Sequence, residues 1–481
     1  MEMDALYAAH PHEECGVFGI YRHGTEGVVA ETYHALYALQ HRGQESCGIA
    51  VNHDGVISCV KDTGLVTDVF TRDVLMKMPE GEMAVGHCLY GAQNNQNVAN
   101  AQPLMVNHSK GTMAISHNGV LTNAAELREQ LELNGAIFHS SSDTEVIAYI
   151  ITQERLKCGS IEEAVRNAMK IIRGAYCLVI MSPTKMIAAR DPHGFRPLCM
   201  GKIGDDVVFA SESCALDAIG ATFERDIAAG EVVVVNETGV KSYKDETACH
   251  DGMCVFEYIY FARPDSVIDG ASVHEARLRA GAFLALEHPA QADVVIGVPD
   301  SGLDAAIGFS RQSGIPYGIG FIKNKYIGRT FIAPGQKQRE DLVRIKLNVV
   351  RNTVEGKRVV MVDDSIVRGT TCARIVKLLR EAGAKEVHVR LASPAFKHPC
   401  YFGTDVDDVK NLIAVTHTDE EIAEIIGADS VGYLPLEACD KLARGSKCGF
   451  CKGCFTGVYP TEPPKRQMIN KFERPLSEKG E

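Results

Sequence analysis

Two adjacent carboxylates end an apolar run in the segment VVMVDDSIVRGTT, residues 359–371. Asp363 and Asp364 suit a ribose diol and a Mg²⁺ ion, which prefers oxygen ligands. The turn that follows leads into a helical pattern and carries hydroxyl groups and a glycine: Ser365, Gly369, Thr370 and Thr371. Backbone N–H groups at a helix start, with hydroxyls beside them, bind a phosphate dianion. The segment therefore predicts a phosphorylated-sugar site with magnesium; the alternative is an ordinary strand, turn and helix.

The cysteines near the end of the chain are a second group of residues that could do chemistry. Cys448, Cys451 and Cys454 have the spacing C-x-x-C-x-x-C within a total of 16 cysteines. Such spacing is typical of metal or iron–sulfur binding in a reducing compartment. A structural zinc site and the absence of any metal are the alternatives. Most of the remaining cysteines lie in apolar stretches, where they are expected to be small core residues.

Up to about residue 245 the elements that must position these groups are short strands, hairpins and a few helices. Residues 48–60 predict two strands joined by a tight turn at Asp54-Gly55. Ser142 with Glu145, and Ser160 with Glu163, have capping-box spacing and predict helix starts, the second helix ending near Gly174. AYCLVIM and EVVVVNE are expected to be buried strands. This order favours a layered α+β sandwich.

From about residue 290 the pattern changes to alternating strands and helices. ADVVIGVPD (292–300), KRVVMVDD (357–364) and EVHVRLAS (386–393) are predicted strands, and CARIVKLLREAG (372–383) is a predicted helix. Continuous apolar strands are typical of a parallel sheet covered on both faces. We expect a doubly wound α/β domain whose ligand lies at the carboxyl ends of the strands. Residues 243–252 are the expected linker.

The composition and charge of the chain exclude several classes of protein. With 481 residues, 45% hydrophobic and 23% charged, the chain is expected to form two ordinary globular domains. A net charge of -12 argues against a nucleic-acid partner, whose phosphates it would repel. No apolar run reaches the ~18–20 residues that span a bilayer, so no membrane partner is expected. The first 14 residues are acidic and lack the apolar core of a secretory signal, so a cytoplasmic location is expected.

The segment 359–371 resembles the signature of the type I phosphoribosyltransferases, which bind 5-phosphoribosyl 1-diphosphate. The resemblance implies that Ser365 to Thr371 hold the 5-phosphate and that Asp363 and Asp364 hold the ribose hydroxyls. GVPDSG (297–302) stands where that family holds the pyrophosphate, so Asp300 and Ser301 are expected there, Ser301 also as a Mg²⁺ ligand. KNKYIGRTFI (323–332) resembles the family's mobile loop. Lys325 and Arg329 would stabilise charge on the departing pyrophosphate, unless this is a solvated basic loop.

Five segments of the N-terminal half resemble the class II glutamine amidotransferases of the N-terminal-nucleophile hydrolase superfamily, whose fold is an αββα sandwich. They are CGVFGI (15–20), LQHRGQESCGIA (39–50), ISHNGVLTN (115–123), SSSDTEVIA (140–148) and ARDPHGFRPL (189–198). By itself a cysteine such as Cys15 is usually a buried strand residue. The resemblance makes it a nucleophile, exposed by cleavage after Glu14, with its own α-amine as base. It further implies that Asn118 and Gly119 form the oxyanion hole and that Asp143 holds the glutamine α-ammonium.

One departure from that family concerns the glutamine α-carboxylate. The usual pattern is G-H-x-R-Y, whose Arg binds this group, but GHCLY (86–90) has Leu89 instead. A buried carboxylate without a cation is costly. Arg42, or a polar group in GAQNNQN (91–97), is the expected substitute. The alternative is an impaired glutamine reaction in which free ammonia is used.

Together the two resemblances imply an enzyme that moves the glutamine amide nitrogen to C1 of phosphoribosyl diphosphate, the first step of purine synthesis. The expected division is a propeptide (1–14), an amidotransferase domain (15–245) and a phosphoribosyltransferase domain (254–465). A non-enzymatic regulator that binds phosphoribosyl diphosphate is the remaining alternative. Feedback by purine nucleotides and a homo-oligomer, dimer or tetramer, are also implied.

The same enzymes include a subset with a short propeptide and a [4Fe–4S] cluster held by four cysteines. Matching its motifs implies the ligands Cys254, Cys400, Cys451 and Cys454. Cys249 and Cys448 are then left over. The cluster would be structural and remote from the chemistry.

Overall fold

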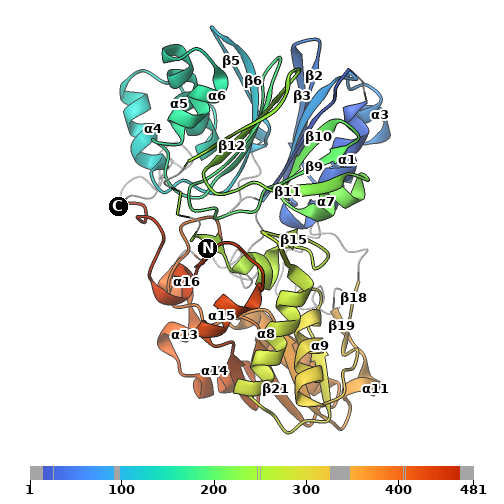
Figure 1. The fold of residues 1–481 in the computed structure, drawn as a ribbon. Helices are drawn as coiled ribbons and strands as arrows, with labels where there is room; N and C mark the ends of the chain where they lie inside the picture. The colour runs from blue at the N-terminus through green and yellow to red at the C-terminus, as the bar shows by residue number, and fades with distance from the viewer. Residues whose placement is uncertain are drawn as a thin grey trace, which may run out of the picture.

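The structure is a computed structural model that describes residues 15–24, 27–90, 98–245, 248–249, 251–324, 347–404, 406 and 408–465. An antiparallel sandwich of two sheets comes first, and a smaller parallel sheet flanked by helices follows it. Figure 1 shows the sandwich at the top and the second unit below it. No helix of the described residues is long and apolar enough to cross a membrane.

The first sheet of the sandwich has the strand order β11-β9-β10-β1-β4-β2-β3. Its bounds are β11 (Thr222–Asp226), β9 (Cys199–Ile203), β10 (Asp206–Ala210), β1 (Gly16–Tyr21), β4 (Met83–Leu89), β2 (Ser46–His53) and β3 (Val56–Thr63). All its pairs are antiparallel, with β1 in the centre between β10 and β4. The predicted hairpin at Asp54-Gly55 is confirmed. Cys15 therefore lies at the start of a central strand.

The second sheet has the order β13-β12-β8-β7-β6-β5. Its bounds are β13 (Gly239–Lys244), β12 (Glu231–Asn236), β8 (Met186–Arg190), β7 (Cys177–Met181), β6 (Gly111–Asn118) and β5 (Leu104–His108). Apolar residues of both sheets, among them Val17, Val179 and Val233, form the core between them. AYCLVIM and EVVVVNE are thus buried strands, as predicted.

Helices cover both outer faces, which gives the predicted αββα layers. α1 (Val28–Ala38) and α7 (Ser213–Ala218) pack on the first sheet, while α5 (Asp143–Lys157) and α6 (Ile161–Ala168) pack on the second. Ser142 and Ser160 cap the starts of α5 and α6, as predicted. The predicted end of α6 at Gly174 is wrong. The helix ends at Ala168, because the chain beyond it pairs with the segment around Leu121. Leu121 and Gly174 form an antiparallel bridge, and the N–H of Ala175 donates to the carbonyl oxygen of Val120 at 2.9 Å.

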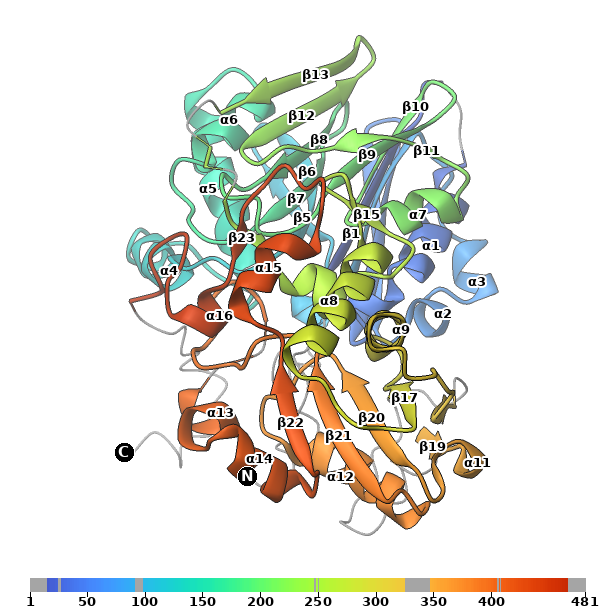
Figure 2. The ribbon, with the colours of Figure 1, turned by 60° about the horizontal axis from the view of Figure 1, so that its bottom comes forward.

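The second unit is a parallel sheet of order β17-β20-β21-β22, with bounds β17 (Val294–Gly297), β20 (Arg358–Asp363), β21 (Glu386–Leu391) and β22 (Ser430–Tyr433). α8 (Val273–Glu287) and α9 (Gly302–Ser313) cover one face, and α12 (Thr370–Glu381) and α14 (Asp419–Ile426) cover the other. Figure 2 shows these strands side by side. The predicted doubly wound sheet is confirmed, and Gly383 follows α12 with a φ of 95°.

Between the two units lie short elements that connect them. β14 (Met253–Cys254) pairs in parallel with β23 (Phe450–Cys451), near the end of the chain. A π-helical turn, η4 (Glu257–Phe261), follows β14 and is almost wholly buried. α15 (Leu436–Leu442) and α16 (Gly453–Thr456) share one apolar core with them, to which Leu442 and Phe455 contribute.

Candidate functional site

Cys15 lies beside the end of the neighbouring strand β4. Its sulfur is 4.0 Å from the carbonyl oxygen of Tyr90, and Gly16 pairs with Cys88 across the sheet. Gly16 permits α1 to approach closely, since a Cβ there would lie 3.1 Å from the Cβ of Leu39. The half-buried thiol is thus held at one rim of the sandwich.

Asn118 is the last residue of β6 and carries a buried side-chain amide. The residue is 1% exposed, and within the described part of the chain neither its Nδ2 nor its Oδ1 has a hydrogen-bond partner. A buried polar group left unpaired costs about 1–3 kcal/mol. The unpaired amide is therefore suited to donate a hydrogen bond to an oxygen atom of a substrate.

Gly119 follows with a φ of 133°, a conformation that disfavours any L side chain. A Cβ there would lie 2.2 Å from the carbonyl oxygen of Ala175. Only glycine allows this turn, which keeps the backbone next to the Asn118 amide in place.

Asp143, the first residue of α5, is anchored to the same turn. Its Oδ2 accepts a hydrogen bond from the backbone N–H of Leu121 at 2.8 Å, and its Oδ1 lies 3.6 Å from Nδ1 of His117. Burial lowers the pKa of His117 despite the nearby Asp143 carboxylate. The structure therefore brings Asp143 and Asn118 to one end of the second sheet.

Leu89 is the half-buried last residue of β4. Successive side chains of a strand alternate between its two faces, so Leu89 shares a face with His87. The His87 ring nitrogen Nε2 is 2.9 Å from the carbonyl oxygen of His117, which precedes Asn118 on the opposite sheet. Leu89 therefore faces the interior between the sheets, as the Arg of the usual pattern would.

The predicted substitute Arg42 has other partners. Its guanidinium is fully buried and donates to both carboxylate oxygens of Glu257, at 2.7 and 2.9 Å, and to Glu212 at 2.6 Å. Its Nε donates to the carbonyl oxygen of Cys15 at 3.2 Å. This geometry argues against the predicted contact with the glutamine carboxylate, because the guanidinium of Arg42 is already hydrogen-bonded to two buried carboxylates. Residues 91–97, the other predicted substitute, lie outside the described residues.

Sequence reasoning missed these carboxylate partners. Glu257 belongs to the π-helical turn, and Glu212 lies just before α7, where its Oε2 also accepts from the backbone N–H of Arg263 at 2.9 Å. Arg42 and Glu257 are 215 residues apart, so no local spacing reveals the pair. The backbone of the candidate nucleophile is thereby tied to the segment that opens the second unit.

In the second unit the two adjacent carboxylates close the central strand β20. Asp363 is buried, its Oδ1 accepts from the N–H of Asp364 at 2.9 Å, and its Oδ2 has no partner within the described part of the chain. Burial and the charge of Asp364 raise the pKa of Asp363 well above its ordinary value. Asp364 accepts from the hydroxyls of Ser301 at 2.5 Å and of Ser365 at 2.6 Å. A cation here would relieve the repulsion between the two carboxylates, so the donor set fits Mg²⁺.

The predicted phosphate loop leads from these carboxylates into α12. Gly369 is the N-cap with a φ of 80°, and Thr370 and Thr371 are the first two helical residues. The loop and Ser301 meet at the carboxyl ends of β20 and β17, which is the expected ligand edge of the sheet.

The predicted pyrophosphate loop is also at this edge. Asp300 is exposed and forms an ion pair of 2.5 Å with Lys323, a cation that the sequence reasoning did not single out. Lys325 and Arg329 lie outside the described residues.

The structure brings the four predicted cluster cysteines together. Cys254 and Cys451 lie opposite each other in the β14–β23 pair. Burial raises the pKa of Cys454 well above its ordinary value, and the neighbouring Cys400, Cys254 and Cys451 raise it further. Cys448 is elsewhere, with its sulfur 3.0 Å from a carboxylate oxygen of Asp269.

Comparisons with known proteins match both halves. Residues 93–218 match the glutamine amidotransferase domain family, and residues 272–424 match the phosphoribosyl transferase domain family. Amidophosphoribosyltransferase of Bacillus subtilis is 49% identical over 456 residues, 94% of this chain and 95% of the relative. The Methanocaldococcus jannaschii amidophosphoribosyltransferase is also 49% identical, over 95% of this chain and 100% of the relative.

A solved structure agrees with these matches. Glutamine phosphoribosylpyrophosphate amidotransferase from B. subtilis, complexed with ADP and GMP, superposes with a TM-score of 0.87 at 48% identity. The match covers 93% of this chain and 98% of that one. The fold, the two candidate sites and the similarity to relatives over nearly the full length all indicate the same family. The chain therefore belongs to the amidophosphoribosyltransferase family.

Proposed function

We propose that the chain transfers the amide nitrogen of glutamine to C1 of 5-phosphoribosyl 1-diphosphate, giving 5-phosphoribosylamine, glutamate and pyrophosphate. This is the first step of purine synthesis. The observation that carries the assignment of residues is that each predicted site contains a buried polar group without a hydrogen-bond partner among the described residues, the Asn118 amide in one and an oxygen of Asp363 in the other. Such groups are costly unless a ligand satisfies them. One lies in each unit, as a reaction with two substrates requires.

Cys15 is the proposed nucleophile of the first half-reaction. Removal of residues 1–14 gives it a free α-amine, which takes the thiol proton. The thiolate attacks the glutamine amide carbon, and the Asn118 side chain and the Gly119 N–H hold the oxyanion. The α-ammonium of Cys15 then gives its proton to the amide nitrogen, the C–N bond breaks, and ammonia leaves. Water then hydrolyses the thioester to glutamate. Asp143 holds the glutamine α-ammonium, which fixes the substrate by its end remote from the amide.

In the second half-reaction ammonia passes inside the protein to C1 and displaces pyrophosphate. Asp363 and Asp364 hold the ribose hydroxyls, and the loop from Ser365 to Thr371 holds the 5-phosphate. Ser301, Asp363 and Asp364 would hold Mg²⁺, which would supply positive charge against the pyrophosphate. Asp300, Lys325 and Arg329 keep their predicted contacts with the pyrophosphate.

Cys254, Cys400, Cys451 and Cys454 are the proposed ligands of a [4Fe–4S] cluster. Burial raises the pKa of Cys451 to about 12, so a bare site would keep its protons and a bound metal would displace them. Tetrahedral zinc with bonds of about 2.3 Å needs sulfur atoms about 3.8 Å apart. Among the described residues, no three of these sulfurs belong to a group whose ligand atoms all lie within 4.8 Å. The wider spacing favours a cluster over zinc.

The cluster assignment is tested by iron and acid-labile sulfide analysis of anaerobically purified protein. Cys254→Ser and Cys400→Ser should lose both, whereas Cys448→Ser, in the same part of the chain, should keep both. Equal iron content in all three variants contradicts the ligand set.

Regulation by purine nucleotides is also proposed, because the B. subtilis structure holds ADP and GMP. We further propose a homo-oligomer and a cytoplasmic location.

The reaction is tested by assaying protein whose N-terminus has been sequenced, with glutamine, in the presence and absence of phosphoribosyl diphosphate and Mg²⁺. Glutamate and pyrophosphate formed together, from protein that begins at Cys15, are the expected result. Pyrophosphate formed with ammonium but not with glutamine would show that Leu89 has disabled the first half-reaction. No pyrophosphate from either nitrogen donor contradicts the proposal.

A further inference from the structure

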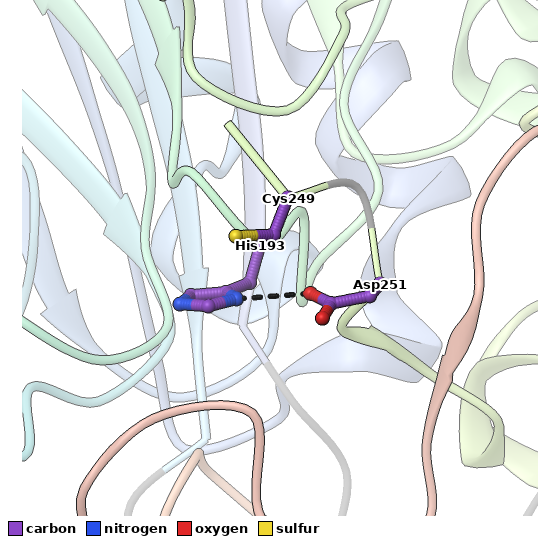
Figure 3. Close-up of side chains that lie close together, drawn as sticks. All are labelled: His193, Cys249 and Asp251. Atoms are coloured by element: carbon purple, nitrogen blue, oxygen red, sulfur yellow. Dashed lines mark hydrogen bonds and ion pairs between the residues drawn. The ribbon is translucent and has the colours of Figure 1, made fainter. Parts of the chain in front are cut away.

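A third group of possible ligands lies where the chain passes from the sandwich to the second unit. His193 comes from the loop after β8, and Cys249 and Asp251 come from the crossover between β13 and β14. One ligand atom of each, a ring nitrogen, a sulfur and a carboxylate oxygen, all lie within 4.8 Å of one another. Figure 3 shows the three side chains converging, with the His193 Nδ1 3.0 Å from Oδ1 of Asp251. We propose that His193, Cys249 and Asp251 form a second metal site, for a borderline divalent cation of the Zn²⁺ type.

Backbone hydrogen bonds hold the two contributing segments next to each other. The N–H of Cys249 donates to the carbonyl oxygen of Pro192, and the N–H of Gly252 donates to that of His193, both at 3.0 Å. A Cβ at position 252 would lie 2.6 Å from the Cβ of His193, so glycine permits this close approach. The segments need no rearrangement to bring the ligands together, which lowers the entropic cost of binding.

The loop that carries His193 is itself fixed by a buried carboxylate. Asp191 is 0% exposed, and its Oδ1 accepts from the N–H groups of His193 at 2.9 Å and Gly194 at 2.7 Å. His193 therefore projects from a rigid turn, while Cys249 and Asp251 approach it from the more exposed crossover.

The three ligand atoms indicate which metal the site would bind. Sulfur, imidazole nitrogen and carboxylate oxygen together suit Zn²⁺, whereas Mg²⁺ prefers oxygen alone. Bonds of about 2.0–2.3 Å place tetrahedral zinc ligands about 3.3–3.8 Å apart, within the observed spacing. A thiolate and a carboxylate also balance the two charges of the cation. Three protein ligands leave a fourth position, open to solvent beside the exposed Cys249 and Asp251.

This site is distinct from the cysteines assigned to the cluster. Cys254 lies beyond the same crossover, but its backbone N–H pairs with the carbonyl oxygen of Phe195, and its sulfur is not in the group of three. A cation bound here would fasten the crossover to the sandwich. Because it binds the folded arrangement, it would stabilise the junction of the two units by mass action.

The test uses full-length protein purified anaerobically, with Zn²⁺ as the probe and a chromophoric chelator as competitor. Wild type should take up one equivalent more than His193→Gln, Cys249→Ser or Asp251→Asn. Each loss should weaken binding by more than the about 10–100-fold caused by removing an outer-shell partner. Cys158→Ser is the matched control, a half-buried cysteine of the same unit outside the group, and it should bind as wild type does.

A second measurement follows the reactivity of Cys249 itself. Alkylation of Cys249 by iodoacetamide, located by peptide mass spectrometry, should slow at least about tenfold when Zn²⁺ saturates the site, because only the thiolate reacts and a bound metal occupies it. The same Zn²⁺ should protect Cys249 less in His193→Gln. Equal Zn²⁺ uptake by wild type and all three variants, or alkylation of Cys249 that Zn²⁺ does not slow, overturns the proposal.

Discussion

Asn118 and Gly119 show how two neighbouring residues serve one proposed function by different physical means. The Asn118 amide is buried, and neither of its polar atoms has a partner among the residues that the structure describes, so the fold keeps an unpaired donor at a cost in stability. Gly119 has no side chain, and the carbonyl oxygen of Ala175 occupies the space that a Cβ would need. The first residue provides the contact, and the second allows the backbone to reach it.

Asn118→Ala tests the oxyanion hole. The kcat for glutamine should fall by about 10²–10³, since a donor that acts in the transition state is lost. The rate with ammonium should stay the same, because that reaction does not use the site. Asn123→Ala is the control: its amide donates to the carbonyl oxygen of Ile171 at 2.9 Å, so the variant should lose stability while keeping its kcat. A fall with ammonium as large as that with glutamine would contradict the assignment.

Leu89→Arg tests how the glutamine α-carboxylate is bound. The new guanidinium would face the same interior as His87, and a hydrogen bond to a charged group is worth about 1.5–3 kcal/mol. We expect the KM for glutamine to fall about tenfold or more. Leu89→Met controls for side-chain size and should leave KM unchanged. An unaltered KM in Leu89→Arg would show that another group already binds the carboxylate.

At the scale of elements, the start of α12 is where strand, loop and helix combine into a phosphate site. The strand β20 delivers Asp363 and Asp364, and Gly369 turns the chain with a φ of 80° so that the helix N–H groups face the loop. A side chain at this φ costs roughly 1–2 kcal/mol. The proposed function therefore depends on the conformation of this turn as well as on its hydroxyl groups.

Gly369→Ala should raise the KM for phosphoribosyl diphosphate by about tenfold, the equivalent of its conformational cost. Its Cβ would also lie 2.9 Å from Cδ1 of Ile413. Gly383→Ala is a matched control, because Gly383 follows the other end of α12 with a φ of 95°. Both variants should lose stability, but only Gly369→Ala should change the KM. An equal change in both would mean that the effect is on folding alone.

Elements with a strong local pattern were predictable, and contacts between distant elements were not. The turn at Asp54-Gly55 and the strand that ends at Asp363 follow from neighbouring residues alone. The end of α6 at Ala168 depends on pairing with a segment around Leu121, which its own sequence does not contain. Arg42 was predicted to bind the glutamine α-carboxylate, but its guanidinium pairs with Glu212 and Glu257 instead. Its carboxylate partners depend on how the two units meet.

At the scale of the whole molecule, the two units meet through buried charges. Arg42 of the sandwich pairs with Glu257, and Arg190 pairs with Asp269 at 2.9 Å. Breaking a buried pair by removing one partner typically costs about 3–5 kcal/mol, since the other charge is left uncompensated. These pairs fix how the sandwich sits on the second unit. They also give the proposed ammonia donor and acceptor sites one rigid connection.

Glu212 makes this junction sensitive to acid. Burial alone would raise its pKa, but His41, Arg42 and the Ser266 hydroxyl hold the pKa well below its ordinary value of 4.5. As the pH falls, Glu212 is therefore protonated near pH 4.5 in the unfolded chain, while it stays ionised in the folded chain. The stability contributed by ionised Glu212 is complete above this pH and is lost as the pH falls through and below it.

Glu212→Gln lacks the contribution at every pH. The difference in unfolding free energy between wild type and variant should therefore be about 3–5 kcal/mol near pH 7 and shrink below pH 4.5. Urea unfolding followed by circular dichroism measures it, with the exposed Glu420→Gln as control. A difference that stays constant from pH 7 down to about pH 3 would show that the charge of Glu212 does not hold the units together.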